Sequence, residues 1–396
     1  MEKRKLNIKQ YSMVIALLAI VLAFAVLTQG KILRPMNVSN VIFQNSYVVI
    51  LGVGMLLCIL TGGNIDLSVG SIVALVGACA GEMLVKSTWN PYVAIAVCLL
   101  IGTACGAWQA FWIAYVKIPP FIVTLSGMLV FRGLTLLILN GLTLAPFPQE
   151  YLMFSTGYIP SPFIEKITLF NTQYNFLSLL VGAVCIIALV TTSLLKRNKK
   201  LRKGYPAESL LSLVAKLALI SIAIAWFFLT IGKFRGIPTV LIIIGLVVIS
   251  YGFFTSNMVQ GRYLYSMGGN MKAAKLSGIK TERMMFFAYT NMGFLAAVAG
   301  LVFAARLNSA SPQAGLSFEL DAIGACFIGG ASAYGGIGTV GGTVIGALIF
   351  GVLNNGMSIM GINSNVQQIV KGLVLLGAVA FDVIGKMNIQ LFPKRK

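Results

Sequence analysis

The sequence contains no histidine, and only 10 of its 396 residues are acidic. Without histidine there can be no His metal site, no histidine proton relay and no Ser–His triad. The pattern GxxxxGK followed by Ser or Thr is also missing, so the chain lacks the loop that cradles nucleotide phosphates. The 6 cysteines lie in apolar stretches without a CxxC pair, which argues against a zinc site. We therefore expect no catalytic residue, metal or cofactor in this chain, which is then not an enzyme. If the protein uses ATP, another subunit must bind it.

Apolar residues are in large excess. They make up 58% of the chain, whereas charged residues make up only 10%, and the mean hydropathy is +0.90. An average soluble protein carries about 25% charged residues. Such a surplus of apolar side chains cannot be hidden in a water-facing fold of this size, so we expect an all-α polytopic membrane protein.

Long apolar runs predict where the chain crosses the membrane. A spanning helix needs about 20 apolar residues, and the sequence predicts about 10–12 transmembrane helices in a single domain, 1–396. The Gly-rich run 321–337 is the weakest, and whether it crosses fully is left open. The candidate runs are 12–28, 41–61, 69–85, 93–116, 119–140, 176–195, 210–232, 238–254, 284–305, 321–337, 340–360 and 364–385.

The formal net charge is +20, and the distribution of the basic residues predicts the orientation. With both termini cytoplasmic, roughly three times as many Lys and Arg residues fall inside as outside, as expected for a membrane protein. The cytoplasmic loops are then 196–209 and 255–283, and 141–175 is the extracytoplasmic loop. The basic run 196–203 is interpreted as contacting anionic lipid rather than nucleic acid.

Polar residues interrupt the apolar pattern between the second and third runs, at 61–71. Polar side chains at membrane depth usually face the protein interior or a water-filled cavity. Asp66 and Ser68 have the residue types that cap a helix, here one beginning near Val69. A capped turn with no substrate contact and a polar site beside Asn64 are equally good interpretations at this point.

A second polar segment begins at Glu319 and Asp321 and continues into a glycine-rich stretch. Part of this stretch fits GxGxxG, but a dinucleotide site would require a βαβ unit, and another membrane helix follows instead. Gly338, Gly342 and Gly346 recur every four residues, which is the small-residue spacing that allows close helix packing in lipid.

A third segment, 268–279, lies in the predicted cytoplasmic loop. We expect a short helix over 272–277 that presents small residues beside charged ones, so that a partner protein could approach closely. An ordinary amphipathic surface helix is the alternative. The candidate docking residues are Gly269, Asn270, Lys272, Ala273, Ala274, Lys275 and Gly278.

Together the three segments closely resemble the permease subunits of bacterial ABC importers for monosaccharides, of the ribose, xylose and galactose type. The resemblance extends over nearly the whole chain, and the extra apolar runs at 210–254 make it most similar to the xylose or multiple-monosaccharide branch. Asn64 is a departure, because many relatives have Gly-Ile-Asp directly at this point.

The resemblance implies a permease domain that moves a monosaccharide, such as xylose, galactose, arabinose or ribose, across the cytoplasmic membrane of a bacterium by alternating access. It also implies partners: a second permease copy, cytoplasmic ABC ATPase subunits that bind ATP and Mg, an extracytoplasmic sugar-binding protein and membrane lipid. Nucleic acid is not among them.

The resemblance also implies roles for the three segments. The third is similar to the coupling helix that contacts the ATPase, and the first two are candidates for the translocation pathway or its gate. The alternative function is an ion-gradient-driven secondary transporter, for which Asp66, Glu82 and Asp382 offer membrane-depth carboxylates. Such a transporter has no use for a helix that docks a partner.

Overall fold

The computed structural model describes residues 8–161, 164–169, 171–205 and 209–387. The chain divides into two compact units, each of which is described by itself. The first unit is built from Met1–Ile32, Val41–Thr156 and Val240–Lys396, and the second from Leu33–Asn40 and Gly157–Thr239. The prediction of an all-α chain is confirmed, with two short strands as the exception among the described residues.

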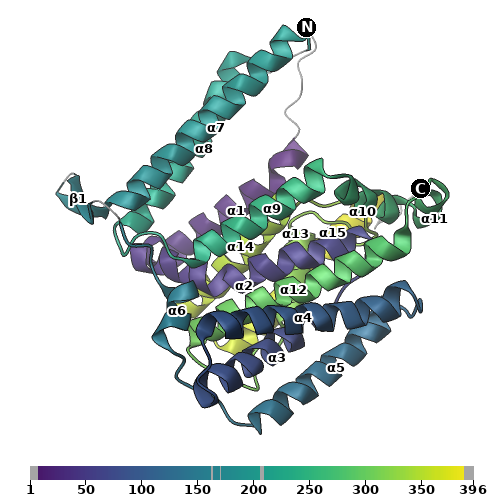
Figure 1. Ribbon diagram of the computed structural model, residues 1–396. Coiled ribbons are helices and arrows are strands. Elements are labelled where there is room, and N and C mark those ends of the chain that lie inside the picture. The colour runs from purple at the N-terminus through teal and green to yellow at the C-terminus, as the bar shows by residue number, and fades with distance from the viewer. Residues whose placement is uncertain (1–7, 162–163, 170, 206–208, 388–396) are drawn as a thin grey trace, which may run out of the picture. The chain divides into compact units, whose positions relative to one another are not determined.

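The helices are often separated by short connections (Figure 1). The 3-10 turn η1 Lys31–Leu33 lies at the boundary between the units, and α2 Pro35–Leu60 begins in the second unit and continues into the first. The π-helix η2 Glu82–Lys86 extends α3. The other helices of the first unit are α1 Ile8–Leu27, α3 Val69–Gly81, α4 Pro91–Ala114, α5 Pro120–Leu139, α6 Gln149–Thr156, α9 Val240–Asn257, α10 Val259–Gly269, α11 Met271–Leu276, α12 Thr281–Leu307, α13 Phe318–Ile328, α14 Val340–Ile359 and α15 Ser364–Met387.

Local sequence explains several of these boundaries. Asn90 accepts a hydrogen bond from the amide of Tyr92 at 2.9 Å and so caps α4, in which Pro91 occupies the first position. Proline is well tolerated there because the first amides of a helix have no intrahelical acceptor. Two helices end at an asparagine. Asn140 and Asn308 adopt left-handed conformations and terminate α5 and α12 at their C-termini.

The core of the first unit surrounds α2, whose residues 45–60 are all buried. A helix that is apolar on every side belongs in the interior. Asn45 donates to the carbonyl oxygen of Ala347 in α14 at 2.8 Å, and the buried Cys58 Sγ lies 3.9 Å from the carbonyl oxygen of Ala288 in α12. Helix α2 therefore joins parts of the chain that are far apart in sequence.

Glycines bring the neighbouring helices close together. Gly293 of α12 faces Gly102 and Gly106 of α4, so closely that a Cβ at Gly293 would overlap the backbone of both. Gly342 and Gly346 of α14 lie in the same way against the backbone of α13. These contacts follow the small-residue packing of membrane helices.

Two non-helical segments interrupt the helices inside the first unit. One, 61–68, joins α2 to α3, and the other, 308–317, joins α12 to α13. Gly315 of the second segment contacts the backbone of Gly70 in the first turn of α3, just after the first segment ends. Non-helical backbone at membrane depth is tolerated only where protein buries it or water lines it, and Asp66, Ser68 and Gly315 of these segments are buried.

The predicted run 321–337 is not one spanning helix. Helix α13 has 11 residues, which is about half the length needed to cross a bilayer, and a turn follows it. After α13 the chain reaches the neighbourhood of α10. There the amide of Gly336 donates to the carbonyl of Leu60 at 3.3 Å, and Tyr265 Oη of α10 donates to the carbonyl of Gly338 at 2.8 Å. Gly338 itself precedes α14 and so lies outside the helix that contains Gly342.

The second unit is a pair of long helices, α7 Phe176–Arg202 and α8 Leu210–Gly232, with a hairpin of strands β1 Lys166–Leu169 and β2 Thr172–Asn175 before them. The strands are antiparallel, with Lys166 opposite Asn175. Residues 196–202, predicted as loop, continue α7 instead. Lys and Arg are good helix formers, and their charge is favourable at a helix C-terminus.

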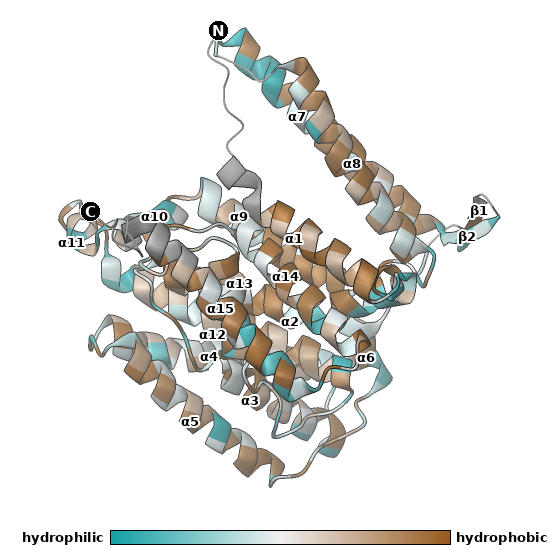
Figure 2. Cartoon of the chain, turned by 180° about the vertical axis from the view of Figure 1, so that it is seen from behind, coloured by the Kyte–Doolittle hydropathy of each residue, from teal (hydrophilic) through white to brown (hydrophobic). Residues whose placement is uncertain are grey.

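Nine of the described helices are long and apolar enough to cross a membrane, and Met13–Leu27 is a shorter apolar stretch. In Figure 2 the long helices are mostly apolar along their length, and the polar colour gathers at helix ends and connections. The predicted outer segment 141–175 is polar, but it contains α6 between Pro148 and Pro160 as well as the hairpin. Prolines therefore stand on both sides of this helix and not within it.

Candidate functional site

Asp66 lies in a fully buried hydrogen-bond network. Its Oδ1 accepts from the Ser68 amide at 2.8 Å and from Ser68 Oγ at 2.6 Å. Ser68 Oγ in turn accepts from Gln109 Nε2 of α4 at 2.6 Å. All three residues have no exposed surface, and Asp66 Oδ2 has no hydrogen-bond partner among the described residues. Through the bond between Gln109 and Ser68, the network connects the non-helical segment 61–68 to α4.

This geometry differs from the expected helix cap. Ser68 is the residue before α3, but its hydroxyl binds Asp66 and Gln109 rather than an amide of the first turn. Asn64 is half-buried, and its Nδ2 donates to Thr61 Oγ1 at 3.1 Å. The three residues suggested for a pathway thus lie in one segment, but Asp66 and Ser68 face protein on all sides in this conformation.

Asp321 lies in a second network, at the start of α13. Its Oδ2 accepts from Tyr47 Oη of α2 at 2.8 Å, and its Oδ1 pairs with Lys371 Nζ of α15 at 2.9 Å. The ring of Tyr47 stacks on Phe318 with 3.8 Å between the centroids. A buried carboxylate such as that of Asp321 is costly unless it is paired and hydrogen-bonded, and here three helices contribute to its network.

Glu319 points away from Asp321, as their separation by two positions on a helix requires. Its Oε2 lies close to Gly70 in the first turn of α3, where Gly315 also contacts this helix. Nearby, Arg132 of α5 donates to the carbonyls of Pro312 and Ala314, at 3.0 and 2.7 Å. Glu319 and Asp321 therefore belong to different surroundings, and the structure does not bring them together with Asp66 in one site.

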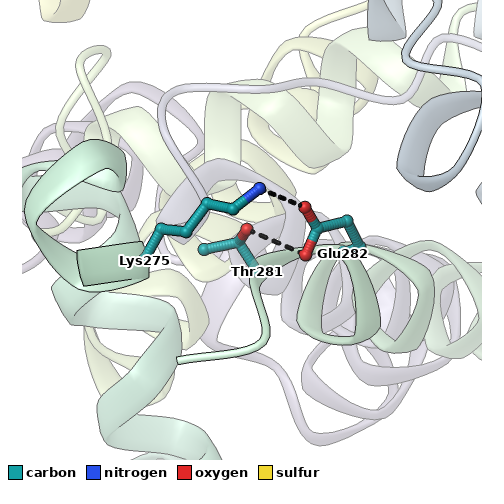
Figure 3. A network of polar contacts seen from close by, with 3 residues as sticks. All are labelled: Lys275, Thr281 and Glu282. Carbon is teal, nitrogen blue, oxygen red and sulfur yellow. Dashed lines mark hydrogen bonds and ion pairs between the residues drawn. The ribbon is translucent and has the colours of Figure 1, made fainter. Parts of the chain in front are cut away.

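The segment expected to contact a partner forms α11. Asn270 caps it by accepting from the amide of Ala273 at 3.0 Å, and Gly278 leaves it with a φ of +84°, a conformation that glycine adopts without strain. Lys275 Nζ binds Glu282 Oε1 at 2.8 Å, and Thr281 Oγ1 donates to Glu282 Oε2 at 3.3 Å (Figure 3). These contacts hold α11 against the start of α12.

The exposed face of α11 differs from the expected one. Ala274 is buried against the chain itself, so its small side chain serves internal packing, whereas Ala273, Lys272 and Lys275 are exposed. Leu276 is 89% exposed, so its apolar side chain lies on the outer face of α11. Gly269 and Asn270 are exposed at the other end of the helix.

A cavity of about 490 Å³ lies beside α11. It is bounded by the turn between α4 and α5 on one side and by α11 and the start of α12 on the other. Its lining residues include Lys117, Pro119, Lys272, Lys275 and Glu282. Helix α11 thus borders a hollow surface made by three parts of the chain.

Gln109, Tyr47, Lys371 and Leu276 are not among the candidate residues predicted from the sequence. Lys371 carried a usable signal, because a lone cation within an apolar run needs a partner. Tyr47 and Gln109 carried none, since aromatic and amide side chains occur in many helices. The exposure of Leu276 depends on which face of α11 packs against the rest of the chain, and no local sequence pattern encodes that orientation.

Three carboxylates were considered for an ion-driven transporter. Asp66 is fully buried and hydrogen-bonded to Ser68. Glu82 pairs with Lys86 at 2.7 Å, with both side chains about 40% exposed. The side chain of Asp382 lies outside the described residues.

Residues 37–379 match the family described as branched-chain amino acid transport system / permease component. The chain is 38% identical to the xylose transport system permease protein XylH of Escherichia coli, over 96% of this chain and 93% of XylH. It is 36% identical to XylH of Haemophilus influenzae, over 97% of this chain and 98% of that protein. No solved structure matches the chain significantly.

A third relative is the ribose import permease protein RbsC of Escherichia coli, 36% identical over 87% of this chain and 85% of RbsC. These matches cover almost the whole fold, including α2, α12 and the segments that carry Asp66, Asp321 and α11. The chain therefore belongs to this family of multi-pass membrane transport permeases.

Proposed function

We propose that this chain is the membrane-spanning subunit of an ATP-driven ABC importer that moves a monosaccharide, such as xylose, galactose, arabinose or ribose, across the cytoplasmic membrane of a bacterium. The observation that carries the proposal is the identity of 38% with a xylose permease over 96% of the chain. The family description names branched-chain amino acids, but both kinds of relative described above are sugar permeases.

The orientation follows from charge. The end of the first unit that contains α10 and α11 carries Arg262, Lys272, Lys275 and Lys280, and basic connections favour the cytoplasmic side. We count segment 308–339 as one crossing of the membrane, because it leads from the end of α12 back to the side of the membrane on which α10 lies. Both termini are then cytoplasmic.

This orientation places α11 where a cytoplasmic ATPase would dock. The chain has no phosphate-cradling loop of its own, so ATP and Mg are bound by that separate subunit, and this chain contributes no catalytic residue, metal or cofactor. A second permease copy completes the pathway, and an extracytoplasmic sugar-binding protein supplies the sugar. Selection by that protein leaves the permease free to bind sugar weakly and release it.

ATP binding and hydrolysis would shift the position of α11, and the contact of Lys275 with Glu282 passes this movement directly to α12. Helix α12 packs on α3 and α4, so its movement reaches the segments that carry Asp66 and Asp321. An ion-gradient-driven transporter is the alternative, but Glu82 is paired at an exposed position, and α11 would then have no partner to contact.

Reconstituted vesicles provide the test. The chain is inserted with its ATPase and given a sugar-loaded binding protein outside, and uptake of radiolabelled xylose, ribose and leucine is measured. We expect uptake of a sugar, not leucine, that needs ATP inside and stops when the ATPase carries a disabled catalytic site. Uptake by this chain alone, driven by a proton or sodium gradient, would contradict the proposal.

A further inference from the structure

A small cavity lies against the ion pair of Asp321 and Lys371. Its volume is about 210 Å³. Its walls come from four helices and from the end of the non-helical segment 308–317. The residues that line it are Tyr47, Leu316, Ser317, Phe318, Leu320, Asp321, Phe350, Gln368, Lys371, Gly372 and Leu375.

The cavity lies at the depth where helical structure is interrupted. It adjoins the beginning of α13, a few residues after Gly315, which contacts Gly70 of α3. Broken helices in transport proteins place polar groups near the middle of the membrane, where a solute can reach them. The location therefore suits a point on a pathway better than a lipid-facing surface.

The ion pair is not sealed off. Asp321 keeps 4% of its side-chain surface, but the side chain of Lys371 keeps 25%, and Gln368, one turn of helix earlier, is exposed. The ammonium of Lys371 and the amide of Gln368 therefore border the open space of the cavity.

The chemistry of the lining indicates which solute fits. Lys371 and Gln368 offer hydrogen-bond donors, the carboxylate of Asp321 and the amide oxygen of Gln368 offer acceptors, and the pair has no net charge. The aromatic rings of Tyr47 and Phe318 add a flat apolar wall. Hydroxyl groups both donate and accept, so a small uncharged polyol with an apolar face matches this combination.

We propose that this cavity is a sugar-contact point of the permease, at which Gln368 and the pair of Lys371 with Asp321 exchange hydrogen bonds with the hydroxyl groups of a passing monosaccharide. The proposal rests on the proposed function. It adds named residues to the pathway and assigns a role to a cation within an apolar helix.

Gln368→Ala is the sharpest test, with Asn365→Ala as its matched control on an exposed position of the same helix outside the cavity. Vesicles with ATPase and loaded binding protein report sugar uptake and ATP hydrolysis in parallel. We expect Gln368→Ala to lower uptake per ATP roughly threefold to tenfold, the value of about one hydrogen bond, and Asn365→Ala to change neither rate. Equal uptake by the two variants would overturn the proposal.

The ion pair is tested by Asp321→Asn combined with Lys371→Met. If the pair only holds helices together, removing both charges restores what either single change damages. We expect the double variant to insert at the wild-type level and hydrolyse ATP when stimulated, yet to take up sugar slowly. Wild-type uptake by the double variant would overturn the sugar-contact role. Failure of the proposed function would be visible separately, as ATP-independent uptake by the unmodified complex.

Discussion

At the scale of single residues, the buried polar groups of the first unit depend on partners that are distant in sequence. Tyr47 and Asp321 are separated by 274 positions, and Gln109 and Ser68 by 41. Each bond closes a contact between different helices. In an apolar interior, a donor or acceptor without its partner loses the solvation that water would have given it.

Ser68→Ala should be destabilising for this reason. It removes the hydroxyl that donates to Asp66 and accepts from Gln109, and leaves both buried groups short of a partner. We expect a loss of about 1–3 kcal/mol, seen as a lower thermal midpoint of the detergent-solubilised protein. Ser266→Ala is the control, because Ser266 is exposed and its hydroxyl donates to the carbonyl of Arg262 one turn earlier on the same helix. Equal midpoints for the two variants would show that the network does not stabilise the fold.

At the scale of helices, contact between α4 and α12 depends on glycine. Gly293→Ala places a methyl group against the backbone of Gly102 and Gly106, and we expect overpacking to cost about 1–3 kcal/mol. The fraction of protein recovered as a monodisperse species after heating measures this. Gly133→Ala in α5 meets nothing within 4 Å and should be neutral or slightly stabilising. If Gly293→Ala did not lower the recovered monodisperse fraction, α4 and α12 would not be packed closely enough for their glycines to be required.

The two faces of α11 should respond differently to substitution. Leu276→Ala removes an exposed apolar side chain, and we expect it to weaken stimulation of ATP hydrolysis more than about fivefold with an unchanged thermal midpoint. Ala274→Leu overfills a buried position and should lower that midpoint instead. Tyr263→Ala, on the neighbouring helix α10, is the control for loss of an exposed large side chain. Normal stimulation with Leu276→Ala would exclude this side chain from the docking surface.

At the scale of the whole chain, the order of crossings sets which segments face which compartment. We expect an impermeant maleimide to label Thr168→Cys of the hairpin in intact spheroplasts, and Ser266→Cys of α10 only after lysis. Both positions are exposed. The background carries Cys185→Ser, because Cys185 is the exposed native cysteine. Labelling of both positions in intact spheroplasts would contradict the topology.

Much of the fold was predictable, since most apolar runs became helices. The run 321–337 was the exception, because it contains only the short helix α13 followed by turns, and hydrophobic periodicity does not report non-helical backbone within an apolar run. The site was predictable only in part. Asp66, Asp321 and α11 were found by residue type, but Ser68 was expected to cap a helix, and Ala274 was expected on the exposed face.

The sequence by itself determined that the chain is a membrane protein, roughly where it crosses and to which family it belongs. These properties depend on the hydropathy and the residue motifs of short continuous stretches of sequence, so they can be recognised without the tertiary structure. Only the tertiary structure decided that Tyr47, Asp321 and Lys371 share one cavity and that Ala274 faces inward. These facts depend on how helices from opposite ends of the chain are brought together, which no local pattern records.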